Sequence, residues 1–139
     1  MKEIEQRIAK METDMAAAFN RHDVDAIVES FDEQLVAFSS TKHERLHGLD
    51  SFRKTFMYYL KQSERTEFEL EEIQVQTFGS TAISTFYWSV TVETKTGPHE
   101  INGRGSHVFV ERNGEWKIVH EHFSRAHNQP ELWDTSPGL

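Results

Sequence analysis

The chain has 139 residues, a formal net charge of −8 and no cysteine. This length suits one domain with a real hydrophobic core. The lack of cysteine excludes disulfides, thiolate metal sites and cysteine nucleophiles. The negative charge and the scattering of the 15 Lys and Arg residues argue against nucleic acid and anionic membranes as partners.

The N-terminal segment MKEIEQRIAK alternates charges where a signal peptide would have an apolar core. No apolar run approaches the roughly 20 residues that a membrane helix needs. We therefore expect a cytoplasmic protein. Its eight histidines are the unusual feature of the composition, because a histidine side chain can act as an acid, a base or a metal ligand.

Helices are predicted in the first part of the chain. Apolar residues recur at three- and four-residue spacing over residues 3–20, which is typical of an amphipathic helix. Asp23 can cap a second, short helix, and the segment LVAFS after it indicates a short strand. Asp50 or Ser51 can cap a third helix with an aromatic stripe.

Strands are predicted from about residue 65, where the apolar period changes to two. The four strand segments are TEFELEEIQVQTF, TAISTFYWSVTVET, GSHVFVER and EWKIVHEHFS. The Asn113-Gly114 pair is the strongest hairpin signal between them. Helices followed by hairpin-linked strands predict an α+β domain, an antiparallel sheet with helices packed on one face.

The last strand segment has an unusual inner face. Regular alternation places five residues on one side, an apolar start followed by a polar rim: Trp116, Ile118, His120, His122 and Ser124. Such a gradient is typical of a ligand pocket. The other side carries Val119 and Phe123, and an exposed apolar surface of this kind favours burial in an association interface.

Two interpretations of the histidine pair remain open. His120 and His122 lie about 6 to 7 Å apart along a strand, close enough to hold one metal, with His107, His47 or Glu72 as a third ligand. Alternatively, His120 is a hydrogen-bonded core residue and His122, nearer the rim, meets a ligand as donor or acceptor. We assign no metal and no cofactor.

Two further residues are candidates for the pocket. Arg104 lies between Gly103 and Gly105, which permit close backbone approach, and its guanidinium could bind a carboxylate or pair with a surface acid. Trp88 and Phe86 share one face of their strand and are expected in the core.

Three segments together resemble a known superfamily. MAAAFNRHDVDAIVESF resembles the opening helices of the nuclear-transport-factor-two-like group, also called cystatin-like or SnoaL-like, which includes ketosteroid isomerases. HGLDSFRKTF resembles its third helix, and RNGEWKIVHEHFS resembles the last hairpin of its SnoaL-like and calcium/calmodulin-dependent kinase association-domain branches. The resemblance implies a strongly bent sheet around the helices, an internal pocket and a homodimer.

The segment HNQPELWDTSPGL has two prolines and few apolar residues, so residues 127–139 are predicted to be a tail. The resemblance predicts one domain over residues 1–126. It also places the isomerases' catalytic Asp near Ser39 and their catalytic Tyr near Met15, so ketosteroid isomerase activity is not expected.

The sequence therefore predicts a homodimer that binds an unidentified small organic molecule, with a carboxylate as one candidate. The predicted pocket comprises Trp88, Arg104, Trp116, Ile118, His120, His122 and Ser124, with His122 as acid or base if the ligand is turned over. The alternative is a non-enzymatic dimerisation or scaffold domain whose pocket is vestigial or regulatory.

Overall fold

A computed structural model describes residues 2–62 and 65–125 of the chain. Its helices are α1 (Lys2–Asn20), α2 (Val24–Val28) and α3 (Gly48–Lys61). Its strands are β1 (Phe31–Phe38), β2 (Leu46–His47), β3 (Thr66–Phe78), β4 (Thr81–Thr94), β5 (Gly97–Arg112) and β6 (Glu115–Arg125). The predicted α+β class is confirmed.

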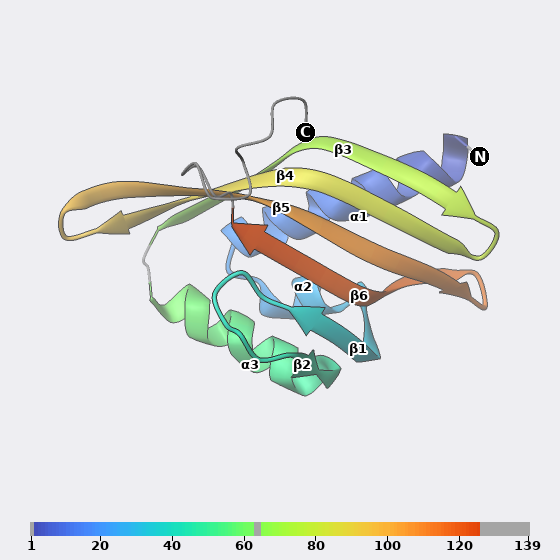
Figure 1. Ribbon diagram of the computed structural model, residues 1–139, viewed down its shortest axis with the longest axis horizontal. Coiled ribbons are helices and arrows are strands. Elements are labelled where there is room, and N and C mark those ends of the chain that lie inside the picture. The colour runs from blue at the N-terminus through green and yellow to red at the C-terminus, as the bar shows by residue number, and fades with distance from the viewer. Residues whose placement is uncertain (1, 63–64, 126–139) are drawn as a thin grey trace, which may run out of the picture.

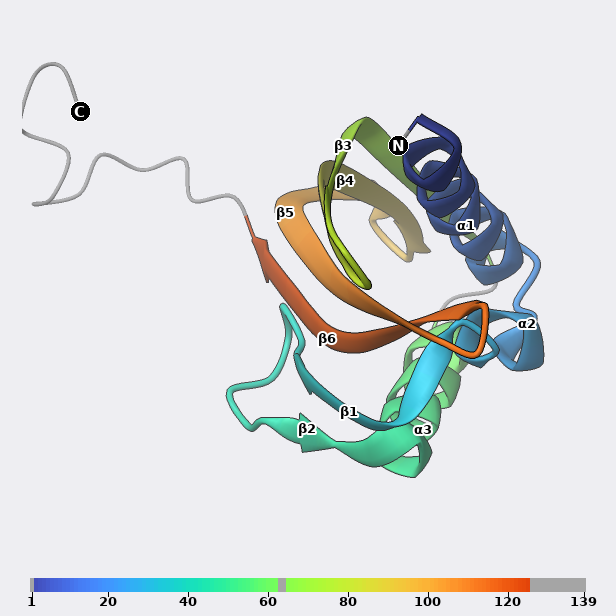
Figure 2. The same ribbon diagram turned by 90° about the vertical axis from the view of Figure 1, so that its right-hand side faces the viewer.

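The strands form a single sheet with the order β2-β1-β6-β5-β4-β3. Strand β1 runs parallel to β6, and every other pair is antiparallel. The sheet is strongly bent and does not close, and α1 and α3 lie on its concave side (Figures 1 and 2). A bent sheet with helices on one side leaves room between the two layers, and this space contains the candidate site.

The core lies between α1 and the concave face of the sheet. Its fully buried apolar side chains include Ile8 of α1, Leu35 of β1, Phe109 of β5 and Ile118 of β6. Because apolar residues repeat every three or four positions along α1, one stripe of that helix faces the sheet over its whole length.

The predicted helix start is correct for α2, whereas the predicted start of α3 is three or four residues too late. The Asp23 carboxylate accepts a hydrogen bond from the backbone N–H of Ala26 at 3.1 Å and caps α2. Helix α3 begins at Gly48, before the expected caps at Asp50 or Ser51. Gly48 has φ +83°, a backbone conformation that favours glycine.

A bulge interrupts β6 at Val119. Phe109 of β5 pairs with Ile118, and the preceding residue, Val108, pairs with His120, so Val119 faces no partner residue. An extra residue in one strand reverses the alternation of side chains beyond it. The inner face of β6 therefore passes from Ile118 to Glu121 rather than to His120.

None of the helices in the described segments is both long and apolar enough to cross a membrane. The predicted domain boundary at residue 126 and the predicted tail, residues 127–139, lie outside the described residues.

Candidate functional site

A cavity of about 280 Å³ lies between the concave face of the sheet and helices α1 and α3. Its wall is mainly apolar and rich in aromatic rings, which include Phe19, Phe56, Phe68, Phe86, Trp88 and Phe123. An engineered apolar cavity of about 150 Å³ suffices for benzene, so this volume suits a molecule of one or two rings.

Two glycines of β5 allow the aromatic wall to form. A Cβ atom on Gly103 would lie 2.3 Å from the ring of Trp88 and 2.1 Å from the carbonyl oxygen of Ser124. A Cβ atom on Gly105 would lie 2.4 Å from the ring of Phe86. The close approach expected at these glycines is confirmed, and it lets the two rings lie over the glycines at the cavity wall.

The cavity has a polar mouth and a charged deep end. Thr41, Gln62 and Arg125 line it and are exposed, which places them at the opening. Glu12 and His107 also line it and are buried, with exposed fractions of 1% and 4%. The site is therefore a largely apolar chamber with polar groups at its two ends.

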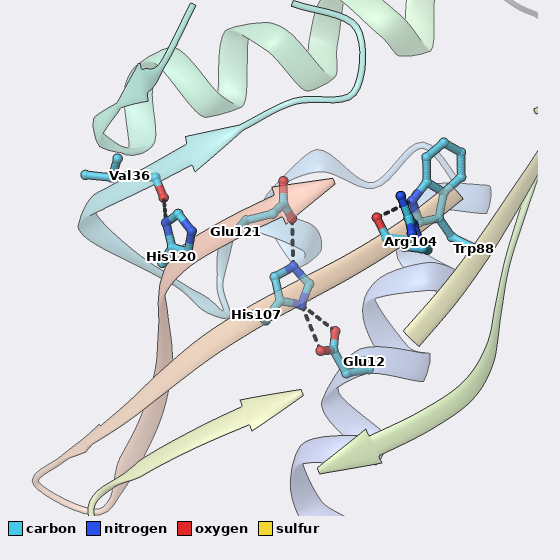
Figure 3. Close-up of polar contacts among 7 residues, drawn as sticks. All are labelled: Glu12, Val36, Trp88, Arg104, His107, His120 and Glu121. Carbon is cyan, nitrogen blue, oxygen red and sulfur yellow. Dashed lines mark hydrogen bonds and ion pairs between the residues drawn. The ribbon is translucent and has the colours of Figure 1, made fainter. Parts of the chain in front are cut away.

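The charged group is a hydrogen-bonded chain of three buried side chains (Figure 3). The Nδ1–H of His107 faces both carboxylate oxygens of Glu12, at 2.9 Å from Oε1 and 2.7 Å from Oε2. The Nε2–H of His107 donates to Oε1 of Glu121 at 2.7 Å. Since both ring nitrogens donate to carboxylates, the geometry is that of an imidazolium between two anions.

The environment of His107 determines its protonation. Burial among the rings of Phe31, Phe86 and Phe123 would lower its pKa. The charges and hydrogen bonds of Glu12 and Glu121 outweigh burial and raise the pKa of His107 from 6.5 to about 10. His107 is therefore protonated at neutral pH.

Each member of this chain comes from a different element. Glu12 lies on the buried stripe of α1, between Ile8 and Met15. His107 takes an inward position of β5, and Glu121 takes the inward position beside it on β6, to which His107 is paired in register. The bulge at Val119 is what turns Glu121 inward.

Comparison with known proteins places the chain in a family. A profile of the SnoaL-like domain matches residues 8–128. The chain belongs to the SnoaL-like domain family. No curated protein matches it by sequence.

Solved structures similar to this SnoaL-like domain share its fold. A nuclear transport factor 2-like superfamily protein from Salmonella enterica has a TM-score of 0.82 and 16% identity, over 99% of this chain and 96% of that one. A candidate dehydratase of the NTF2-like family from Streptomyces avermitilis has a TM-score of 0.81 and 15% identity, over 91% and 98%. The CaMKII hub of S. rosetta has a TM-score of 0.72 and 23% identity, over 88% and 96%.

The structure of the SnoaL-like domain separates the residues predicted to form one pocket. Trp88 lines the cavity, and its indole N–H donates to the backbone oxygen of Arg104 at 3.0 Å. Trp116 and Ile118 are buried in the core but are not part of the cavity wall. Among the predicted residues, Trp88 is thus the one that meets the cavity.

The other four predicted residues lie on the convex face of the sheet. Arg104, His122 and Ser124 line a separate, polar hollow of about 400 Å³ there, and His120 faces the same side. The prediction that they share a face with Trp116 and Ile118 is wrong, because it assumed regular alternation through Val119. By the same reversal Phe123, predicted to face outward, lines the cavity of the SnoaL-like domain.

The histidine pair does not form a metal site within the described residues, where no group of three or more His, Asp or Glu side chains is placed to hold an ion. The ring of His120 donates from Nδ1 to the backbone oxygen of Val36 at 2.9 Å. This hydrogen bond corresponds to the alternative interpretation of His120 as a satisfied structural residue. His122 is exposed and packs against the ring of Phe38, with centroids 5.3 Å apart.

Glu12, His107 and Glu121 were not predicted to form a unit. One signal was present: Glu12 interrupts the apolar stripe of residues 8–15, and an unpaired carboxylate is too costly to bury there. That signal predicts a buried partner for Glu12 without naming it.

Proposed function

We propose that this SnoaL-like domain binds a small, mainly apolar organic molecule in the cavity and transfers a proton on it, in an isomerase- or hydratase-type reaction. The observation that carries the proposal is the buried chain of Glu12, His107 and Glu121, all three of which line the cavity.

Glu121 is the proposed proton acceptor. Glu12 directs both of its oxygens to Nδ1 of His107, whereas Glu121 uses Oε1 for Nε2 and has no further hydrogen-bond partner for Oε2 among the described residues. A general base needs a free lone pair within reach of the ligand. His107 keeps its proton at neutral pH, so it orients Glu121 and leaves base catalysis to the carboxylate.

The apolar wall supports this role. In a chamber with little water, the hydrogen bond from the His107 imidazolium holds the Glu121 carboxylate in place more strongly than it would in solution. The proton taken up by Oε2 can be returned to another atom of the same ligand, which is an isomerisation, or can assist the loss of water from it, which is a dehydration. Both reactions need only these protein groups.

A test uses 2-tetralone, a two-ring ketone with acidic C–H bonds. Exchange of these hydrogens in D₂O is followed by proton NMR with the wild-type protein and with Glu121→Gln. We expect the wild type to accelerate exchange and Glu121→Gln to lose about 10²-fold of that acceleration. Glu115→Gln, an exposed Glu on the same strand, is the matched control and should exchange like the wild type. No acceleration by the wild type, or equal acceleration by Glu121→Gln, would contradict the proposal.

A second role, as a homodimer, is favoured by the convex face of the sheet. No described helix covers this face (Figure 2), and Tyr87 of β4, which lies on it, is 51% exposed. The face is acidic along β3, at Glu67, Glu69 and Glu71, and carries Arg104 and His122 on β5 and β6. Two copies related by a twofold axis can oppose these halves.

The homodimer is tested by light scattering after size exclusion. The wild type is expected to run at twice the chain mass, and Tyr87→Glu at the mass of one chain. Tyr58→Glu is the matched control, because Tyr58 is 58% exposed on α3, away from the convex face. A monomeric wild type, or a dimeric Tyr87→Glu variant, would contradict the dimer without bearing on the cavity.

A further inference from the structure

Arg125 provides a positive charge at the mouth of the cavity. It is the last residue of β6, lines the cavity and is exposed. It follows Glu121 and Phe123 at intervals of two on the inner face of the strand. It is also the one Lys or Arg among the described residues that line the cavity.

The guanidinium of Arg125 is available for a ligand. It has no hydrogen bond or ion pair with any residue in the ranges 2–62 and 65–125, whereas Arg53 pairs with Asp25 and Arg112 pairs with Asp32. Arg7, Arg45 and Arg104 also lack an acid partner among the described residues, but Arg125 is the one of these arginines that lines the cavity. A guanidinium can form two parallel hydrogen bonds with a carboxylate.

The deep end of the cavity repels an anion. The imidazolium of His107 lies between two carboxylates, which leaves one net negative charge there. A ligand carboxylate placed beside Glu121 would add a second negative charge in a poorly solvated site. The positive charge of Arg125 at the mouth and the net negative charge at the deep end therefore determine the orientation of an anionic ligand, with its anionic group at the mouth.

We propose that the ligand is an elongated apolar carboxylate whose carboxylate binds Arg125 at the mouth and whose apolar end, with the reacting carbon, lies beside Glu121. Arg125 lies four positions after Glu121 on an extended strand, a span of about 13 Å. This inference rests on the proposed function, since it assigns a substrate class to the same cavity.

The test compares acids with their neutral amides. Binding of 6-phenylhexanoate and 6-phenylhexanamide is measured by calorimetry at low and at high salt. An exposed charge-assisted contact should make the acid bind about tenfold more tightly than the amide at low salt, and less so at high salt. Phenylacetate, too short to reach both ends, should show no such preference over phenylacetamide.

The chain offers a matched pair of variants. Arg125 and Arg104 lie on neighbouring strands but on opposite faces of the sheet, because Arg125 pairs with Gly103 and Arg104 pairs with Ser124. Arg125→Gln should bind acid and amide equally, while Arg104→Gln should keep the wild-type preference.

Three outcomes would overturn the inference. Equal binding of acid and amide by the wild type removes the anion site but leaves the cavity proposal standing. If the preference for the acid over the amide survives in Arg125→Gln and is lost in Arg104→Gln, the carboxylate binds on the convex face instead. Failure of both compounds to bind, with no exchange of 2-tetralone, removes the inference together with the proposed function.

Discussion

His107 and Glu12 are joined by a two-oxygen hydrogen bond that spans 95 residues of sequence, with Nδ1 2.7 and 2.9 Å from the carboxylate oxygens. Glu121 completes the arrangement from the other side of the ring. All three side chains are buried, so the proton on His107 contributes to the stability of the fold as well as to the proposed chemistry.

The first prediction is that the free energy of unfolding falls as pH rises from about 6.5 to 10. The pKa of His107 is about 10 in the folded protein, against the ordinary value of 6.5 that holds when the chain unfolds. Below 6.5 both states bind the proton, and the contribution of His107 is fully present. Above that pH the unfolded chain releases the proton first, so the contribution decreases and is lost near pH 10. It is on the order of a few kcal/mol.

Urea denaturation at several pH values measures this loss. His43→Asn, in an exposed loop, should keep the wild-type slope, and His107→Asn should flatten it. If His107→Asn does not fold, nitrogen-15 NMR of the wild type answers the question directly. An imidazole of His107 that is neutral at pH 8 would contradict the prediction.

The second prediction concerns Glu12 itself. Glu12→Gln removes one anion from a buried ion pair and leaves the imidazolium of His107 less stabilised, so we expect a loss of about 3 kcal/mol in unfolding free energy. Glu3→Gln, exposed at the start of the same helix, should change stability by about 0.5 kcal/mol or less. Equal stability of the two variants in urea denaturation at pH 7 would show that Glu12 is not buried against His107.

The third prediction concerns Gly103. A Cβ atom there would lie 2.1 Å from the backbone oxygen of Ser124, so Gly103→Ala must separate β5 from β6 or displace Trp88. We expect a loss of about 2 kcal/mol or more, as for other overpacked core positions. The neighbouring Asn102 is exposed, and Asn102→Ala should cost about 0.5 kcal/mol or less. A Gly103→Ala protein as stable as Asn102→Ala in thermal unfolding would rule out the close contact.

The fourth prediction separates the two faces of β6. His122→Ala should leave 2-tetralone exchange and ligand binding within about twofold of wild type, because His122 lies on the convex face. Phe123→Ala, one residue further along, should weaken binding of 6-phenylhexanamide, since its ring lines the cavity. The opposite pattern in calorimetry would restore His122 to the site predicted from alternation.

Local patterns in the sequence predicted the elements well. The apolar stripe of residues 3–20, the cap at Asp23 and the Asn113-Gly114 turn each depend on neighbours a few residues away, and the structure contains all three. The resemblance to the superfamily predicted how these elements are arranged, and the SnoaL-like profile confirms it.

The site was harder to predict, because it depends on one unpaired residue and on distant partners. A bulge at Val119 has no distinctive sequence signal, yet it exchanges the faces of His120, Glu121, His122 and Phe123. The pairing of Glu12 with His107 joins the first helix to the fifth strand, and no local period contains that information.

The same long-range pairing constrains the order of folding. During synthesis α1 leaves the ribosome while β5 and β6 have not yet been made, so Glu12 has no cation to meet and its helix cannot dock without burying an isolated charge. Docking becomes favourable only after His107 and Glu121 have joined the sheet. The first helix is therefore expected to be among the last parts of the chain to become protected from hydrogen exchange, a late, non-local step typical of folds with high contact order.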